Sequence, residues 1–322
     1  MAQRVILVYG YPGFRDALVR AVNAAEGNRW AAETLSVRGR GFEVLRRILR
    51  SNVIIMIGGP WLGGRFIAVL GVLARLRSKP AVIVYWAGSD VMEAARSGSW
   101  ARGPVGRWLL GAMVHFVTAP WLQGELAGAG IRAQQLYLPA WAVSIPERVP
   151  PFPAQVRVLA YLPGADPRFY GAEFIRRLSM EFPSVEFVIV GQDAPTGGWP
   201  GNVQVLGWVS DMSQLYPRVT ALIRLPRHDS MARMVVEALS YGRYVAWTHA
   251  FPGVCRCESL PQVRSFLADL VAKADRGALA PNEEGRQAAR DIGPEPSLAR
   301  LLDAIDKELS RRSRGRRGAV RT

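Results

Sequence analysis

Two acidic residues eight positions apart, Asp229 and Glu237, are the strongest candidates for chemistry in this chain. They lie within residues 222–247, LIRLPRHDSMARMVVEALSYGRYVAW, which begin and end with a β-strand pattern. A polar loop follows the first strand, and a helix then carries Glu237 and stops at Gly242. This spacing puts one carboxylate at the mouth of the helix and the other about two turns inside it. Carboxylates placed in this way can accept hydrogen bonds from the hydroxyl groups of a ligand.

Each of these acids also has an ordinary structural interpretation. Asp is a preferred N-cap, so Asp229 could simply start a helix over residues 231–241. Glu237 could be a solvent-facing helix residue. In either case the backbone N–H groups of residues 230–233 are predicted to open the helix, and a helix start is a natural phosphate site.

Strands alternate with helices over residues 1–140, which positions several glycine turns at strand ends. Strands are expected at 4–8, 33–37, 53–57, 81–86, 114–118 and 135–138, and helices near 12–26, 42–50 and 64–78. Continuous apolar strands alternating with helices predict a parallel sheet covered on both faces. Because such sheets bind ligands beyond the carboxyl ends of their strands, Gly13 and Asp90 are predicted on a binding rim.

The proline-rich stretch 139–153 interrupts this alternation and predicts a linker, which we place at 141–154. The pattern then restarts, with strands expected at 156–161, 185–190, 203–206 and 221–225 and helices at 168–182, 261–274, 283–292 and 297–312. The prediction is therefore an α/β chain of two doubly wound Rossmann-like domains, 1–140 and 155–295, facing each other across a cleft. A terminal helix and an Arg-rich tail occupy 296–322.

The net charge of +15 is unevenly distributed. Residues 1–150 hold 18 Lys and Arg against 8 Asp and Glu, a net charge of +10. Residues 311–322 hold six Arg and no acid, which leaves residues 151–310 at −1. The domain that contains the two acids is therefore nearly neutral, and we expect the basic tail, 311–321, to be disordered.

Residues 38–79 are basic and amphipathic, with nine Lys and Arg, one acid and interleaved aromatic and aliphatic residues. This pattern is typical of segments that bind a membrane surface. It predicts that the first domain docks on the anionic cytoplasmic leaflet, where the 311–322 tail adds to the attraction. The alternative is a solvated basic face above a core helix.

The cysteine count and the hydropathy limit other classes. Cys255 and Cys257 form a lone C-x-C, too few ligands for a metal site, and are expected to be free thiols in a reducing compartment. We expect no signal peptide, because the N-terminus runs directly into a strand pattern. No apolar run approaches the ~20 residues that span a bilayer.

Residues 185–247 resemble the GT-B glycosyltransferases, and within them the retaining family 4, also called group 1. The family signature is E-x7-E followed by Ala-x-x-x-Gly, and this chain has Asp229, Glu237, Ala238 and Gly242, with Asp in place of the first Glu. Gly191 after VEFVIV, and NVQVLGWV at 202–209, match two further family motifs in the right order. The first half is similar in architecture only.

The resemblance implies a role for each matched residue. Glu237 would accept hydrogen bonds from the donor ribose, and Asp229 from the donor sugar; together with Arg168 they form the implied catalytic set. The implied donor-binding set adds Gly191, Arg224, His228, Ser230, Met231, Ala232 and Arg233.

The basic pair that holds the donor diphosphate in this family is incomplete here. Arg168 stands within one residue of the expected Lys, and the expected Arg has no counterpart, so Arg224 and Arg233 are candidates for the missing charge. Arginines bind phosphate bidentately and would replace a metal, so no metal and no cofactor is expected.

A catalytic base is not identified among the three histidines. His115 lies in an apolar strand, which favours a packing role, and His228 adjoins Asp229, where it could contact the donor or remain an exposed loop residue. In the retaining enzymes that this chain resembles, the leaving phosphate is thought to take the acceptor proton. Asp90 could face the acceptor, or it could cap the next helix.

Together these features predict a retaining, metal-independent glycosyltransferase of the hexosyl type. It would move a sugar from a nucleotide-sugar to a lipid-linked or polysaccharide-precursor acceptor, as a peripheral protein on the cytoplasmic face of the plasma membrane. The alternatives are a sugar-nucleotide 2-epimerase of the same fold, a catalytically silent partner subunit, and a basic nucleic-acid-binding protein. The neutral second domain and the lack of a nucleic-acid motif disfavour the last.

Overall fold

The chain divides into two domains. The computed structural model describes residues 4–27, 29–37, 41–58, 64–76, 80–96, 99–139, 145–164, 166–192 and 198–319. The first domain combines Met1–Ala142 with Ile292–Thr322, and the second is Val143–Asp291. Parts of the predicted basic region, residues 38–40, 59–63 and 77–79, lie outside the described residues, as do 320–322.

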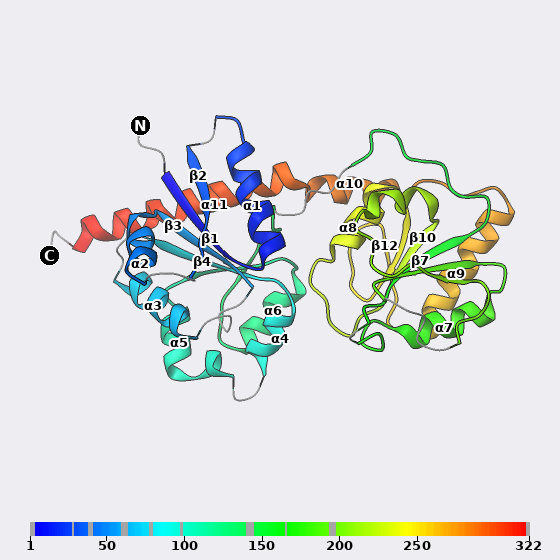
Figure 1. Ribbon diagram of the computed structural model, residues 1–322, viewed down its shortest axis with the longest axis horizontal. Helices are drawn as coiled ribbons and strands as arrows, with labels where there is room; N and C mark the ends of the chain where they lie inside the picture. Colours follow the sequence, from blue (N-terminus) through cyan, green and yellow to red (C-terminus); the bar gives the residue numbers. More distant parts are fainter. Residues whose placement is uncertain are drawn as a thin grey trace. The chain divides into compact units, whose positions relative to one another are not determined.

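The first domain is built on a parallel sheet (Figure 1). Its six described strands run in the order β2-β1-β3-β4-β5-β6. They are β1 (Arg4–Gly10), β2 (Trp30–Thr34), β3 (Val53–Ile57), β4 (Ala81–Trp86), β5 (Val114–Val117) and β6 (Gln134–Gln135). Every residue of β3 and β4 is buried, as expected for central strands covered on both faces. The strand predicted at 33–37 begins earlier, because Trp30 and Ala32 alternate into the core and pair with β1.

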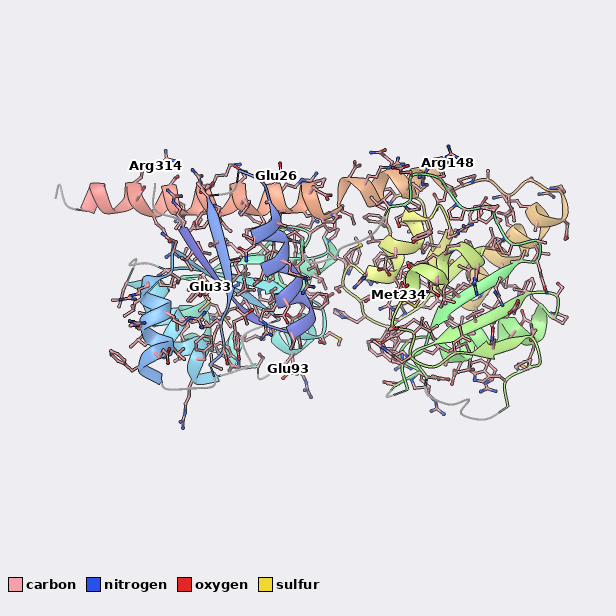
Figure 2. The ribbon with its side chains drawn as sticks, turned by 45° about the horizontal axis from the view of Figure 1, so that its top comes forward. Glu26, Glu33, Glu93, Arg148, Met234 and Arg314 are labelled. Carbon is pink, nitrogen blue, oxygen red and sulfur yellow. The ribbon has the colours of Figure 1, made fainter. Side chains whose placement is uncertain are left out.

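The helices of the first domain include the C-terminal one. They are α1 (Pro12–Ala24), α2 (Gly41–Arg50), α3 (Gly64–Arg75), α4 (Ser89–Ala95), α5 (Pro104–Leu110), α6 (Trp121–Gly128) and α11 (Pro294–Ala319). Helix α11 lies beside α1 in both views (Figures 1 and 2) and places Leu301 and Ile305 in the core. The chain therefore returns to the first domain after completing the second.

The expected disorder of the basic tail is wrong for its described part. Helix α11 continues to Ala319. Arg311 and Arg312 both bond to Glu308 on the preceding turn, and Arg312 also donates to the carbonyl of Ala112. Such i, i+3 and i, i+4 pairs between opposite charges stabilise a helix.

The second domain is also built on a parallel sheet, with six described strands in the order β12-β11-β10-β7-β8-β9. They are β7 (Arg157–Tyr161), β8 (Glu186–Val190), β9 (Val203–Val205), β10 (Ala221–Arg224), β11 (Tyr244–Trp247) and β12 (Val254–Arg256). The chain winds outward from β7 through β8 and β9, then restarts on the other side of β7 with β10. The carboxyl ends of β7 and β10 are therefore the topological switch point, where doubly wound sheets bind ligands.

Helices cover both faces of this second sheet. They are α7 (Ala172–Glu181), α8 (Arg233–Ser240), α9 (Leu260–Asp275) and α10 (Glu283–Asp291). Helices α7 and α9 share one core with the strands, whereas α8 packs against α10. The prediction started α7 at Arg168, but residues 168–171 form a turn that ends at Gly171 in a left-handed conformation, φ 82°. A side chain there would be strained and would press on Leu225 of the neighbouring strand end, so glycine sets where α7 starts.

The described part of the proline-rich linker is fastened to the second domain by two buried arginines. Arg243 donates to the carbonyl of Pro150, and Arg286 to that of Pro146. Proline carbonyls accept hydrogen bonds although proline has no N–H to donate, which suits this contact.

Among the described residues, no helix is both long enough and apolar enough to cross a membrane.

Candidate functional site

Asp229 lies in the loop after β10, where Arg224 and Trp247 hold its carboxylate. The guanidinium of Arg224 donates through Nε to Oδ2 at 2.7 Å and through Nη2 to Oδ1 at 3.1 Å. The indole N–H of Trp247, at the end of β11, donates to Oδ2 at 3.1 Å. Asp229 is only 9% exposed. The carboxylate is therefore fixed by side chains from two neighbouring strand ends, which is a rigid arrangement for a ligand contact.

The alternative that Asp229 is the N-cap of the helix is not what the structure shows. Helix α8 begins at Arg233, and its N-cap residue is Ala232. The predicted start, residues 230–233, is corrected accordingly: Ser230 and Met231 precede the helix, and the Ser230 N–H bonds to Asp229. Of residues 230–233, only Arg233 belongs to the first turn of α8.

Arg224 is buried between aromatic rings. Its guanidinium carbon lies 5.3 Å from the ring centroid of Tyr161 and 5.4 Å from that of Tyr170. Burial by itself lowers the pKa of this guanidinium, but the charge and hydrogen bonds of Asp229 outweigh burial, so the pKa is raised. The Arg224–Asp229 pair is therefore a buried ion pair with cation–π contacts on its basic side.

Glu237 lies two turns into α8 and is 8% exposed, which excludes the solvent-facing interpretation. The hydroxyl of Tyr216 donates to Oε2 at 2.6 Å, and Nε of Arg233 donates to Oε1 at 2.7 Å. Burial, followed by the charge of Glu237, raises the pKa of the Tyr216 hydroxyl well above its ordinary value, so this hydroxyl stays a donor. Each carboxylate oxygen has a second lone pair that a ligand hydroxyl could use.

Gly191 ends β8 in a conformation that needs glycine. Its φ is +92°, and a Cβ would lie 2.7 Å from the ring of Tyr161. The Gly191 N–H donates to the carbonyl of Gly207 at 2.8 Å, which ties the ends of β8 and β9 together. The predicted donor residue Gly191 therefore lies against Tyr161, whose ring also contacts Arg224.

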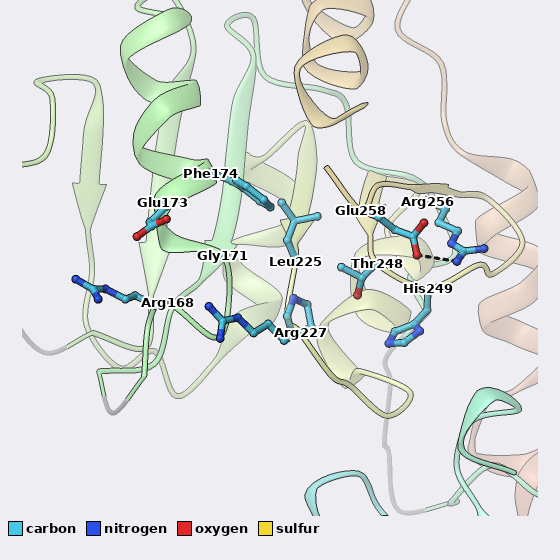
Figure 3. A pocket seen from close by; sticks show the side chains of 11 residues that line it. Arg168, Gly171, Glu173, Phe174, Leu225, Arg227, Thr248, His249, Arg256 and Glu258 are labelled. Atoms are coloured by element: carbon cyan, nitrogen blue, oxygen red, sulfur yellow. Dashed lines mark hydrogen bonds and ion pairs between the residues drawn. The ribbon is translucent and has the colours of Figure 1, made fainter. Parts of the chain in front are cut away.

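A cavity of about 490 Å³ opens at the same edge of the second sheet (Figure 3). It is lined by residues from the loops after β7, β10 and β11, from the start of α7 and from β12: Arg168, Gly171, Glu173, Phe174, Leu225, Pro226, Arg227, Thr248, His249, Arg256 and Glu258. Of the predicted site residues, Arg168 lies here. Arg224 and Arg233 do not line this cavity and instead bind the two acids.

The two acceptor-side residues predicted in the first domain differ in their surroundings. Gly13 is exposed in the first turn of α1, beyond the end of β1. Asp90 is 1% exposed, and its carboxylate accepts the backbone N–H groups of Ala87 and Gly88 at 2.6 to 2.8 Å. The prediction that Asp90 faces an acceptor is therefore corrected, because its carboxylate orders the turn into α4.

The structure places His115 and the two cysteines as follows. His115 is buried in β5, where it accepts from the indole N–H of Trp86 and lies 2.8 Å from the carbonyl of Leu110. Burial lowers its pKa to about 4, so it is a neutral packing residue. Cys255 and Cys257 are free thiols, and the described residues contain no cluster of three His, Cys, Asp or Glu suited to a metal ion.

Several residues of this site carry no signal that the sequence reasoning could use. Tyr216 and Trp247 bond to the two acids from other elements, and Arg227 and Thr248 line the cavity. Leu215-Tyr216 follows the motif at 202–209, and Trp247 is the last residue of the stretch 222–247. Neither position in the sequence assigns a role to the residue. Their roles depend on which strands become neighbours.

Comparison with known proteins shows similarity at the level of structure. No protein-family model and no curated protein matches the chain by sequence. Solved structures match over nearly the whole chain. Sucrose-phosphate synthase from Thermosynechococcus elongatus is 12% identical with a TM-score of 0.66, covering 95% of this chain and 99% of its own.

Two further solved structures agree. A glycosyltransferase from Rickettsia africae is 10% identical with a TM-score of 0.67, covering 96% of this chain and 99% of its own. Anabaena Alr3699/HepE, in complex with UDP-glucose, is 14% identical with a TM-score of 0.61, covering 95% and 99%. The chain has the GT-B fold. At these identities the likeness establishes the fold, and the function must be argued from the site.

Proposed function

We propose that this GT-B protein is a retaining glycosyltransferase that takes a hexosyl group from a nucleotide-sugar. The observation that carries the proposal is the pair Asp229 and Glu237, both buried and both held by side chains of the second domain, Asp229 in the loop after β10 and Glu237 on α8. The nucleotide-sugar class is supported by HepE, a structural neighbour whose solved structure holds UDP-glucose.

The geometry suits the two roles proposed for the acids. The Glu237 carboxylate, held by Tyr216 and Arg233, would accept hydrogen bonds from the ribose hydroxyls. The Asp229 carboxylate, held by Arg224 and Trp247, would accept them from the sugar. Fixed acceptors of this kind cost little reorganisation when a ligand binds. The leaving diphosphate would be stabilised by guanidinium groups without a metal, and it would take the proton of the acceptor hydroxyl on the same face.

A thermal-shift screen of UDP-, GDP-, ADP- and dTDP-sugars tests the donor proposal. A donor at ~100-fold excess over its dissociation constant should add ~2.7 kcal/mol to the free energy of unfolding. We expect Glu237→Ala to abolish this gain and Glu237→Gln to reduce it. Glu284→Gln is the matched control, because it removes the same charge from an exposed position on α10.

Three outcomes of the screen would count against the proposal. Stabilisation by none of the nucleotide-sugars contradicts it, and so does a hit that survives Glu237→Ala unchanged. Conversion of the bound nucleotide-sugar to its 2-epimer without any acceptor would instead assign the epimerase activity.

We also propose that the acceptor is lipid-linked and that the first domain docks on the cytoplasmic face of the plasma membrane. Helices α2 and α3 lie next to each other in Figures 1 and 2, and α3 packs on α5. Helices α2, α3 and α5, with the residue after α3, expose large apolar side chains: Phe42, Leu45, Leu49, Val69, Val72, Leu76, Val105 and Trp108. The arginines Arg46, Arg50, Arg65 and Arg75 are exposed on the same helices.

The contacts of Arg75 show how charge and aromatic surface combine on this face. Its guanidinium carbon lies 5.0 Å from the ring centroid of Trp108, and its Nη2 donates to the Trp108 carbonyl. Amphipathic aromatic groups beside arginines are typical of surfaces that enter the headgroup layer. Co-sedimentation with phosphatidylcholine vesicles, with and without phosphatidylglycerol, tests this. We expect binding only to the anionic vesicles, and equal binding to both contradicts the electrostatic attraction.

A further inference from the structure

Two arginines at the switch point, Arg168 and Arg227, have no counter-charge bound to them among the residues that the structure describes. Arg168 follows β7 and Arg227 follows β10, and both line the 490 Å³ cavity. Figure 3 shows the two guanidinium groups on the same side of the cavity, with an ion pair drawn only between Arg256 and Glu258. Within the described part of the chain, neither the Arg168 nor the Arg227 side chain has an ion pair or hydrogen bond.

The other arginines of the site are already engaged. Arg224 gives two of its donors to Asp229, and Arg233 gives its Nε to Glu237. A phosphate group that drew either arginine away would leave a buried carboxylate without its charged partner, which is costly. The charge for an anionic ligand is therefore more readily supplied by Arg168 and Arg227.

Three further features of the cavity favour an anion. Helix α7 begins at this wall behind Gly171, so its positive end faces the cavity. The hydroxyl of Thr248 is buried there without a hydrogen-bond partner among the described residues. The Arg256–Glu258 pair is neutral as a unit, so the two unpaired arginines outweigh the one remaining acid, Glu173.

We infer that Arg168 and Arg227 together clamp the diphosphate of the donor, with Arg227 supplying the charge that the sequence motif lacks. The inference rests on the proposed function for the identity of the ligand as a nucleotide-sugar. Arg227 lies two residues before Asp229, so a single loop would contact both the diphosphate and the sugar. Guanidinium groups from two loops can each make bidentate bonds to phosphoryl oxygens, which orients the leaving group as well as binding it.

Inorganic pyrophosphate is the probe that tests the clamp, because it carries the charge without a base or a sugar. Its affinity for the full-length protein is measured by isothermal titration calorimetry. We expect Arg168→Gln and Arg227→Gln each to lower the affinity by about 10- to 100-fold, the effect of losing charge-assisted hydrogen bonds. Arg276→Gln is the matched control and should change nothing, since it lies at the far end of α9.

The outcomes separate this inference from the proposed function. Pyrophosphate binding that Arg227→Gln leaves unchanged, or no binding at millimolar pyrophosphate, overturns the clamp. If Glu237→Ala abolishes nucleotide-sugar binding while Arg227→Gln does not weaken it, the proposed function stands and the clamp fails. If both arginine variants lose pyrophosphate but no nucleotide-sugar binds, the anion site stands and the proposed function fails.

Discussion

The carboxyl edges of the two sheets are built from different chemical groups. At the edge of the second domain, side chains bind one another: Arg224 and Trp247 hold the buried Asp229, and Tyr216 and the exposed Arg233 hold the buried Glu237. At the edge of the first domain, backbone groups make the corresponding contacts. Strand β1 ends at a glycine with positive φ, Gly10, and β3 and β4 are followed by two more, Gly58 and Gly88. The carboxylate of Asp90 is bound by backbone N–H groups.

This difference indicates where chemical specificity can reside. A network of ion pairs presents fixed charges and spare lone pairs, which suits recognition of a small polar ligand such as a sugar phosphate. The glycine at the end of β1 is required by the chain's own packing, because a Cβ at Gly10 would lie 1.9 Å from the carbonyl oxygen of Ile57. The first domain instead places its charge on helix surfaces, which suits attraction over a wide area.

Of the substitutions that test this difference between the domains, breaking the Arg224–Asp229 pair should change stability most. We expect Arg224→Met to destabilise the second domain by about 3–5 kcal/mol, because it leaves the Asp229 charge buried and uncompensated. Amide hydrogen exchange should lose protection in β10 and β11 while β3 and β4 keep theirs. Adding Asp229→Asn should recover a large part of the loss. Equal protection in Arg224→Met and the unmodified protein would mean that the pair does not organise this edge.

The sequence predicts the architecture of this site better than its contacts. The apolar runs at 53–57 and 81–86 coincide with β3 and β4, and the acids Asp229 and Glu237 lie on the predicted loop and helix. These features depend on local periodicity, which a sequence displays directly. Strand β12, with only the three residues Val254–Arg256, is too short to show a period and was missed.

The contacts depend on strand order, which local patterns do not encode. Arg168 and Arg227 are far apart in sequence and line the same cavity because β10 pairs with β7 rather than with β9. Tyr216 reaches Glu237 from a separate 3₁₀ turn, Tyr216–Arg218. Asp90 illustrates the opposite error: an acid after a glycine turn looks the same in sequence whether it faces a ligand or, as here, its own backbone.

Acidification should destabilise the first domain through His115, lowering the free energy of unfolding by about 3 kcal/mol. Its pKa of about 4 lies below the ordinary value of 6.5, so the unfolded chain binds the proton more readily. The contribution of His115 to stability is therefore complete above pH 6.5 and is lost as the pH falls from 6.5 to about 4. We expect His115→Gln, which can still donate to Leu110 and accept from Trp86, to flatten urea-unfolding stability between pH 7 and pH 4.5. An unchanged pH slope in this variant would show that His115 is not the sensitive group.

The smallest stability effect is expected at the outer face of α2. Phe42 is 80% exposed, so Phe42→Ser should change the free energy of unfolding by no more than about 0.5 kcal/mol. The same substitution should weaken binding to vesicles that contain phosphatidylglycerol, because it removes an apolar group beside the exposed arginines of α2.

Met180→Ser is the matched control for Phe42→Ser. Met180 is also more than half exposed, but it lies on α7 of the nearly neutral second domain. If both substitutions weaken vesicle binding equally, the attraction does not distinguish the two domains, and the basic face of the first domain is only a solvated surface. If only Phe42→Ser weakens it, the two domains have different binding roles. The second domain then recognises a small anionic ligand, and the first binds a charged surface.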